Sequence, residues 1–225
     1  MVLKLYGASN SLMGGGKAAV ALTLIEKEIP FEFISVDLDA GEHKTPEFHV
    51  LNPFGLVPVI VDDDGFIVYE GRAICKYLEE KYAGQGTSLL PKDLNDRTKV
   101  EQAIFAETTT FFPSAIKAGA EALKPSRGLP IEQAVLHENL KKISDCLDAY
   151  EIILARHRFL AGDDFTLADL FHYYVVQFLE LASIDIVKDK GPNVTRWWNE
   201  LLSRPSWIKL IGDGLAGTAW RDLNH

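Results

Sequence analysis

Val57-Pro58-Val59-Ile60-Val61-Asp62-Asp63-Asp64-Gly65-Phe66-Ile67-Val68-Tyr69 is the stretch that decides the fold. Two runs rich in β-branched and aromatic residues flank an Asp-Gly turn, and this pattern predicts a β-hairpin. Pro58 stands inside the first run, although proline cannot donate a hydrogen bond to a β-ladder. We therefore expect Pro58 to lie either on an edge strand or in a special turn.

The segments around this hairpin complete the order βαβ–ββα. Apolar spacing predicts a strand, a helix and a strand before the hairpin and one helix after it. These elements are Val2–Tyr6, Lys17–Glu28, Phe31–Val36 and Gly71–Tyr82. The order describes an α+β thioredoxin-like domain over residues 1–83, in which the position of Pro58 is a cis-proline. That peptide geometry would expose the backbone of Val57 to an extended ligand.

Beyond a polar, glycine-containing linker from Ala83 to Pro91, the sequence has no convincing strand pattern. Apolar spacing predicts four helical stretches: Leu94–Leu123 with a bend near Pro113, Ile131–Arg156, Thr166–Leu181 and Val194–Leu202. Strands followed by helices indicate two domains, so we expect an all-α domain over residues 91–225. Thr166 and Asp169 form a capping box, in which the hydroxyl accepts from the Asp169 amide and the carboxylate reaches back.

Composition narrows the classes of partner. The net charge of −9 and the sequence pI near 5.2 argue against nucleic acid or an anionic membrane as partners. The two cysteines, Cys75 and Cys146, have no metal-ligand spacing and are expected to be reduced and buried. The N-terminus lacks a secretory signal, and no apolar run approaches the length of a membrane helix. We therefore expect a soluble cytoplasmic protein.

Ser11 lies between the first predicted strand and the first predicted helix. A hydroxyl at this place can hydrogen-bond a thiolate while the helix N-terminus adds positive potential, and both effects lower a thiol pKa. The alternatives are ordinary loop chemistry or a helix N-cap, with Ser9 as a nearby competitor. Gly14-Gly15-Gly16-Lys17 fails the phosphate-loop pattern, because Ser11 and Ala18 stand where that motif needs Gly and Ser or Thr.

Two polar segments are candidates for binding carboxylates. His43 and Lys44 offer two possible cations in one loop, although charged loop residues are usually only solvated. Glu70 and Gly71 open a predicted helix, whose backbone amides attract a carboxylate while Glu70 would hold an ammonium group; a solvated helix start is the alternative. In the helical half, Phe105, Phe111 and Phe112 lie near the predicted bend and are either core residues or part of an apolar ligand pocket.

These segments, in this order, resemble a cytosolic glutathione S-transferase, most closely the phi class and its fungal relatives. The resemblance extends from Leu3 to Trp207. Three stretches in the correct order carry most of it: Asp39-Ala40-Gly41-Glu42-His43-Lys44, Asn52-Pro53-Phe54-Gly55-Leu56-Val57-Pro58, and Phe159-Leu160-Ala161-Gly162-Asp163-Asp164-Phe165-Thr166-Leu167-Ala168-Asp169-Leu170.

The resemblance implies a transferase that conjugates the glutathione thiolate to a hydrophobic electrophile in detoxification. It implies glutathione as co-substrate, no metal, and a homodimer. Ser11 matches the catalytic hydroxyl, and the helical domain contributes the electrophile pocket. The residues matched to the glutathione site are His43, Lys44, Val57, Pro58, Glu70 and Gly71, and the candidates for the electrophile pocket are Met13, Phe111 and Phe112.

The sequence departs from the family at three places. The segment Ser11–Lys17 is a few residues longer and richer in glycine than the family's Ser-Thr-x-Thr-Arg. Gly71 replaces a serine whose hydroxyl would donate to the γ-glutamyl carboxylate, a loss of about 1–3 kcal/mol of affinity. Leu56 replaces a polar residue. Two alternatives follow, a non-catalytic ligand carrier and a biosynthetic enzyme for one natural product, whereas a cysteine-based thiol transferase lacks a cysteine in the first loop.

Overall fold

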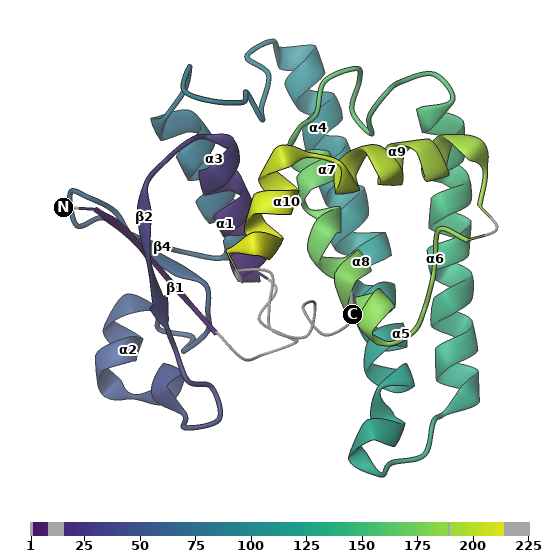
Figure 1. Cartoon of the computed structure of the whole chain (residues 1–225), viewed down its shortest axis with the longest axis horizontal. Coiled ribbons are helices and arrows are strands. Elements are labelled where there is room, and N and C mark those ends of the chain that lie inside the picture. The colour runs from purple at the N-terminus through teal and green to yellow at the C-terminus, as the bar shows by residue number, and fades with distance from the viewer. Residues whose placement is uncertain (1, 9–15, 189, 214–225) are drawn as a thin grey trace. The chain divides into compact units, whose positions relative to one another are not determined.

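The computed structural model describes residues 2–8, 16–188 and 190–213, drawn in colour in Figure 1. Its contacts group the chain into two compact units. Unit 1 comprises Met1–Ser88 with Pro205–His225, and unit 2 comprises Leu89–Arg204. Each unit is built around its own core.

Unit 1 contains a four-stranded mixed sheet. Its strands are β1 (Leu3–Gly7), β2 (Phe31–Ser35), β3 (Val59–Val61) and β4 (Ile67–Tyr69), in the spatial order β2-β1-β3-β4. Strand β1 runs parallel to β2, and β3 runs antiparallel to both β1 and β4. The predicted order of the strands along the chain, the parallel βαβ pairing and the Asp-Gly hairpin are therefore confirmed.

Helices cover both faces of this sheet (Figure 1). Leu5 and Ile60 are paired neighbours with no exposed surface, on the face that packs against α1 (Gly16–Glu26) and α3 (Gly71–Lys81). On the other face, Val59 packs with Phe48 of the helix α2 (Pro46–Leu51). The alternation of side chains along a strand thus supplies two separate apolar surfaces, one for each helical layer.

Helix α2 (Pro46–Leu51), with the short helical turn η1 (Glu42–Lys44) before it, lies between β2 and β3, where apolar spacing predicted no helix. The Thr45 side chain accepts a hydrogen bond from the Phe48 amide at 3.2 Å, and Pro46 opens the helix. A threonine N-cap followed by proline is a recognised helix start. The signal was therefore present, but the six-residue helix is too short to show apolar periodicity.

Helix α10 (Pro205–Gly212) belongs to unit 1. Trp207 is buried, and the Ser206 hydroxyl donates to the buried Glu26 carboxylate at the end of α1. The Thr87 hydroxyl donates to the same carboxylate at 2.6 Å. The helical domain was predicted over residues 91–225, but α10 belongs to the unit that contains the sheet, because α10 buries its apolar face against α1.

Among the described residues of unit 2, the regular elements are all helices. It contains α4 (Leu94–Ala106), the π-helix η2 (Glu107–Phe111), α5 (Phe112–Ala122), the short turn η3 (Lys124–Arg127), α6 (Gln133–Leu154), α7 (Leu167–Leu170), α8 (His172–Leu181) and α9 (Pro192–Leu202). The first three are continuous, and the predicted irregularity near Pro113 takes the form of a π-helical turn just before it. Among the described residues, no helix is both long and apolar enough to cross a membrane.

A buried carboxylate organises the start of α7. Asp169 has no exposed surface, and its Oδ2 accepts from the Thr166 amide at 3.1 Å, while the Thr166 hydroxyl accepts from the Ala168 amide. The capping box is confirmed in both directions, and the hydroxyl accepts from the Ala168 amide as well. The other oxygen, Oδ1, accepts from the Leu160 amide at 3.0 Å and from the Trp197 indole at 2.9 Å. Burial raises the pKa of Asp169 to about 6.

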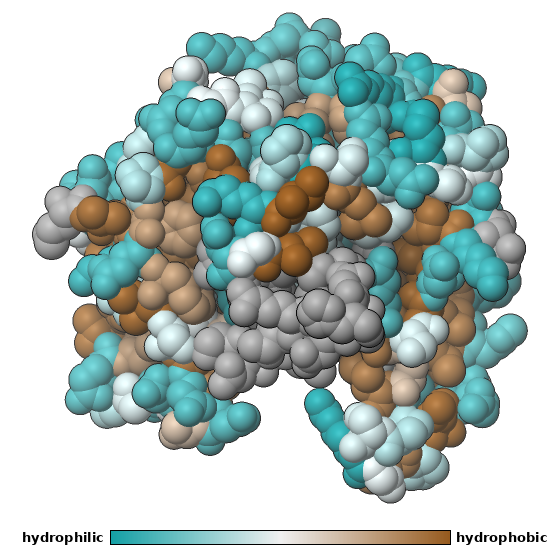
Figure 2. Space-filling view, viewed as in Figure 1, coloured by the Kyte–Doolittle hydropathy of each residue, from teal (hydrophilic) through white to brown (hydrophobic). Residues whose placement is uncertain are grey.

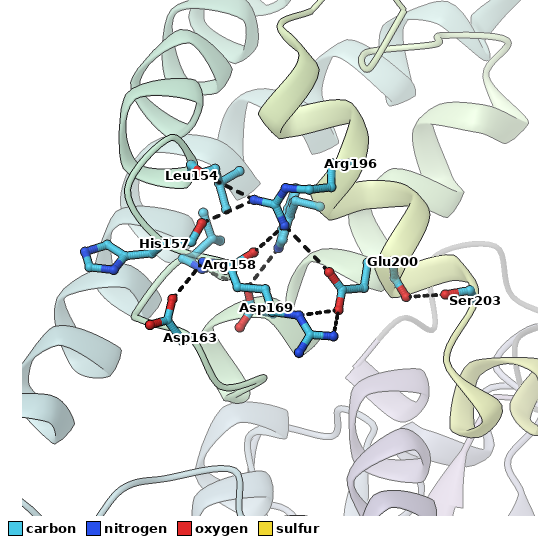
Figure 3. A network of polar contacts seen from close by, with 10 residues as sticks. Leu154, His157, Arg158, Asp163, Asp169, Arg196, Glu200 and Ser203 are labelled. Atoms are coloured by element: carbon cyan, nitrogen blue, oxygen red, sulfur yellow. Dashed lines mark hydrogen bonds and ion pairs between the residues drawn. The ribbon is translucent and has the colours of Figure 1, made fainter.

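Figure 3 shows the exposed polar contacts beside this carboxylate. The Arg196 guanidinium from α9 donates to the carbonyl oxygen of Leu154, the last residue of α6, and to those of His157 and Arg158, which follow the helix. Glu200 pairs with Arg158, whose Nε lies 2.7 Å from the carboxylate. The carbonyl at the end of α6 is thereby hydrogen-bonded rather than left without a donor.

Candidate functional site

Three backbone segments meet at the carboxyl-end side of the sheet in unit 1. A Cβ built on Gly16 would stand 2.6 Å from Cδ of Pro58, and one built on Gly71 would stand 3.4 Å from the Gly16 carbonyl oxygen. The Val57–Pro58 peptide is cis, as predicted. The first residues of α1 and α3 therefore touch the proline that precedes β3, and Gly16 admits no side chain there.

Glu70 begins α3 in a conformation that few non-glycine residues adopt. Its φ is +69°, and its carbonyl accepts the first helical hydrogen bond from the Ile74 amide at 2.9 Å. The Glu70 carboxylate is exposed and makes no capping hydrogen bond within the described part of the chain. The backbone amides at the N-terminus of α3 suit an anion, and the Glu70 carboxylate beside them suits a cation.

The loop containing His43 and Lys44 packs against the loop before Val57. The Lys44 ammonium donates to the Gly55 carbonyl at 2.7 Å and lies 3.4 Å from that of Phe54. Gly55 has a φ of +57°, and a Cβ there would stand 2.7 Å from the His43 carbonyl. Since an ammonium group has three donors, Lys44 keeps capacity for a carboxylate. His43 Nδ1 is buried with no hydrogen-bond partner among the described residues.

Asn52 shapes the segment that leads to the cis peptide, and the sequence analysis gave it no role. It is 1% exposed; its side chain donates to the Leu56 carbonyl at 2.8 Å and accepts from the Phe54 amide at 3.0 Å. These two bonds set the course of the backbone immediately before Val57. An asparagine before proline and glycine is a turn signal, and it was the available clue.

The remaining predicted site residues are Ser11, Met13, Phe111 and Phe112. Ser11 and Met13 lie outside the described residues. Phe111 was wrongly placed in an electrophile pocket: it is 1% exposed, with its ring 5.1 Å from that of His172 and 6.1 Å from that of Tyr150, inside the core of unit 2. Phe112 is half-buried, 6.4 Å from the Tyr174 ring, and stays a prediction.

Neither cysteine is a candidate nucleophile. Both are free and buried, as predicted. Burial raises the pKa of Cys75 to about 12, and burial also raises the pKa of Cys146. A reactive cysteine needs a lowered pKa and access to solvent, so these thiols are structural.

Three neighbouring carboxylates lie close together at the hairpin, with ligand atoms of Asp62, Asp63 and Asp64 within 4.8 Å of one another. The Lys81 ammonium bonds Asp62 at 2.7 Å and Asp63 at 2.9 Å, and the Tyr77 hydroxyl donates to Asp62 at 2.6 Å. The hydrogen bonds to Asp62 and then Asp63 raise the pKa of Lys81. The Lys81 ammonium thus offsets the negative charge of these carboxylates, and the cluster has a structural role.

Unit 2 carries an apolar pocket of about 250 Å³ between α4 and the end of α6. Its lining includes Ala103, Ala106, Ile153 and Leu160, together with the cationic side chain of Arg156. Ile152, which also lines it, is 63% exposed. Figure 2 shows apolar side chains reaching the surface along the α6 side of this unit. An apolar pocket next to exposed apolar side chains is typical of a contact surface.

Two protein families match the chain, one over each part. Residues 18–81 match the glutathione S-transferase N-terminal domain, and residues 107–205 match the glutathione S-transferase C-terminal domain. The first range contains Pro58 and Gly71 but begins after Gly16.

Similar proteins cover almost the whole chain. Glutathione S-transferase F9 of Arabidopsis thaliana is 40% identical over 214 residues, which are 94% of this chain and 97% of the relative. The crystal structure of glutathione transferase F2 from Populus trichocarpa has a TM-score of 0.86 and 37% identity, covering 96% of this chain and all of that one. Glutathione S-transferase I from maize, in complex with an atrazine glutathione conjugate, has a TM-score of 0.82 and 34% identity, with 94% and 97% covered.

Proposed function

Because the chain belongs to the glutathione S-transferase family, we propose that it binds glutathione along the Val57 main chain and directs the glutathione sulfur at a hydrophobic electrophile. The observation that carries the proposal is the meeting of Gly16, cis-Pro58 and Gly71, flanked by the Lys44 loop and the open start of α3. That arrangement offers an extended peptide one main-chain partner and two ends suited to charged groups.

Each end of the tripeptide has a place in this proposal. The γ-glutamyl carboxylate accepts from the backbone amides at the N-terminus of α3, and its ammonium group pairs with Glu70. The cysteinyl residue pairs with the backbone of Val57. The glycyl carboxylate takes the remaining donor of Lys44 and a ring N–H of His43. Asn52 supports the site by holding the Leu56 carbonyl, without touching glutathione.

The chemistry uses the sulfur of glutathione and the hydroxyl of Ser11. The bound thiol loses its proton to solvent, and the Ser11 hydroxyl donates a hydrogen bond to the resulting thiolate. The sulfur lone pair forms a bond to the electrophilic carbon, and the leaving group departs with its bonding electrons. We assign Ser11 this role from its place in the family order. A cytoplasmic location and a role in detoxification remain predictions from the sequence.

Retention on glutathione-agarose, together with conjugation of glutathione to an aryl halide, tests the function directly. A transferase is retained and turns over. A ligand carrier binds an apolar dye tightly but forms no conjugate, and an enzyme specialised for one natural product is retained without turning over a generic electrophile. If the protein is not retained on glutathione-agarose, the proposed tripeptide site is wrong.

Gly71→Ser is expected to tighten glutathione binding about tenfold, because the added hydroxyl restores a donor to a charged carboxylate. A Cβ at this position meets its nearest neighbours at 3.4–3.7 Å, which is ordinary contact, so the side chain fits. Isothermal titration calorimetry gives the affinity. Gly71→Ala adds the same Cβ without the hydroxyl and should stay within about twofold of wild type. Equal affinities for the serine and alanine variants would contradict the prediction.

The homodimer implied by the family has a candidate contact. Phe54 is 63% exposed and makes an edge contact with the Tyr69 ring, whose centre lies 6.0 Å away. We propose that Phe54 inserts into the apolar pocket between α4 and α6 of a second copy.

Phe54→Ser should raise the dimer dissociation constant at least about thirtyfold, because central aromatic contacts contribute about 2 kcal/mol or more. Light scattering after gel filtration measures this. Ile208→Ser, at a residue 60% exposed, is the matched control and should stay dimeric; a dimeric Phe54→Ser variant would refute the contact.

A further inference from the structure

His49 is a histidine of α2 whose ring lies beside the contact between Lys44 and Gly55. A Cβ built on Gly55 would stand 3.0 Å from Nε2 of His49 and 3.2 Å from Cδ of Lys44. The Lys44 ammonium in turn donates to the Gly55 carbonyl at 2.7 Å. Gly55, which has no side chain, therefore lets the imidazole and the lysine stem approach the same point of the chain.

The other ring nitrogen of His49 decides which nitrogen carries the proton of the neutral ring. Nδ1 lies 2.8 Å from the Thr45 carbonyl oxygen. Because a carbonyl oxygen only accepts, Nδ1 is the donor and holds the proton. In that tautomer Nε2 carries a lone pair, and it becomes a donor only when the ring takes up a second proton. His49 is exposed, so a solute can reach its ring.

Three residues whose side chains can carry positive charge thus meet Gly55. Besides Lys44 and His49, His43 contributes its carbonyl, which would stand 2.7 Å from a Cβ on Gly55. The Nδ1 of His43 is buried and has no hydrogen-bond partner among the described residues. Such a group of donors suits a carboxylate, whose two oxygens accept from several donors at once.

The titratable groups of the elements that pack here are few. The turn η1 supplies Glu42, whose carboxylate accepts from a backbone amide at 2.7 Å, in addition to His43 and Lys44. Helix α2 supplies Glu47, which is exposed. The segment 52–56, which packs against the ring, has no titratable side chain. Because Lys44 is a cation, the imidazole takes up a proton more readily when a carboxylate is bound than in the free protein.

We propose that His49 is a third binding residue for the glycyl carboxylate of glutathione, and that its ring takes up a proton as this carboxylate binds. The proposal rests on the proposed function, which places the carboxylate at Lys44 and His43. Histidine takes up a proton near neutral pH, so the glycyl end is held more tightly as pH falls. The contact also favours a tripeptide over γ-glutamylcysteine, which lacks a carboxylate at this position.

A comparison of two ligands across three variants tests this role. His49→Leu removes both ring nitrogens, His49→Lys keeps a charge that does not titrate near neutral pH, and His137→Leu makes the same change at an exposed histidine of α6. The ligands are S-methylglutathione, which has no thiol, and S-methyl-γ-glutamylcysteine, which also lacks the glycyl residue. Isothermal titration calorimetry at about pH 6 and about pH 8 gives each affinity, and thermal unfolding reports whether each variant folds.

His49→Leu is expected to lower the affinity for S-methylglutathione about tenfold at about pH 6 and about twofold at about pH 8, because only the charged ring donates to the carboxylate. Its affinity for S-methyl-γ-glutamylcysteine should stay within about twofold of wild type. His49→Lys should restore binding at both pH values, and His137→Leu should change neither affinity.

Two results would overturn the His49 role and leave the proposed function standing. One is an equal loss of affinity for both ligands in His49→Leu, and the other is wild-type affinity of that variant for S-methylglutathione at the lower pH. Failure of the wild-type protein to bind S-methylglutathione would instead overturn the proposed function, and the His49 role with it.

Discussion

Ser11→Ala is expected to lower kcat/KM for an aryl halide about fiftyfold near neutral pH. The hydrogen bond from the hydroxyl is proposed to lower the thiol pKa from about 9 to about 7, so at neutral pH its loss lowers the ionised fraction of the thiol from about one half to about one hundredth. The loss should shrink as pH rises, since the thiol of the variant also ionises in alkaline solution. A pH profile of kcat/KM measures both features, and its midpoint should move up by about two units.

Two controls make this result specific to residue 11. S-methylglutathione should bind the Ser11→Ala variant within about threefold of wild type, because the hydroxyl contacts the sulfur rather than the rest of the tripeptide. Ser9→Ala makes the same change on the competing hydroxyl and should retain full activity. If Ser9→Ala loses turnover while Ser11→Ala keeps it, the catalytic hydroxyl is Ser9.

The sheet of unit 1 was predictable because its signals are local. The Asp-Gly turn fixes the hairpin, and alternation over a few residues fixes each strand. The cis peptide before Pro58 was expected from the thioredoxin-like order of elements, because a proline inside a strand-like run alone also allows an edge strand. Helix α10 was not predictable in this way, because its place in unit 1 depends on a contact with α1 nearly two hundred positions earlier.

The candidate site was predictable residue by residue but not as an arrangement. His43, Lys44, Glu70 and Gly71 could each be picked out as polar or helix-start positions, and family order connected them. That Gly16 must lack a side chain because it touches Pro58 is a long-range fact that no local pattern contains. Phe111 shows the opposite failure, since position near a helix bend does not tell which side of a helix is buried; the π-helical turn containing it places its ring in the core.

Asp169→Ala is expected to destabilise the protein by about 3–5 kcal/mol, the largest effect on stability that we predict. The carboxylate has no exposed surface and accepts from two backbone amides, of Leu160 and Thr166, and from the Trp197 indole. Removing it leaves these donors buried without an acceptor, each at a cost of about 1–3 kcal/mol, partly relieved by relaxation. Equilibrium unfolding in urea measures the change.

Asp163→Ala is the matched control for that measurement. The Asp163 carboxylate accepts one hydrogen bond, from the Arg158 amide at 3.1 Å, in an exposed part of the same loop (Figure 3). Water can replace this acceptor, so the loss should stay below about 1 kcal/mol. The contrast tests whether burial decides the effect, because both substitutions remove a carboxylate from the same segment. Equal losses in the two variants would mean that the contacts of Asp169 in the core, including the Trp197 indole, contribute no more than an exposed loop bond.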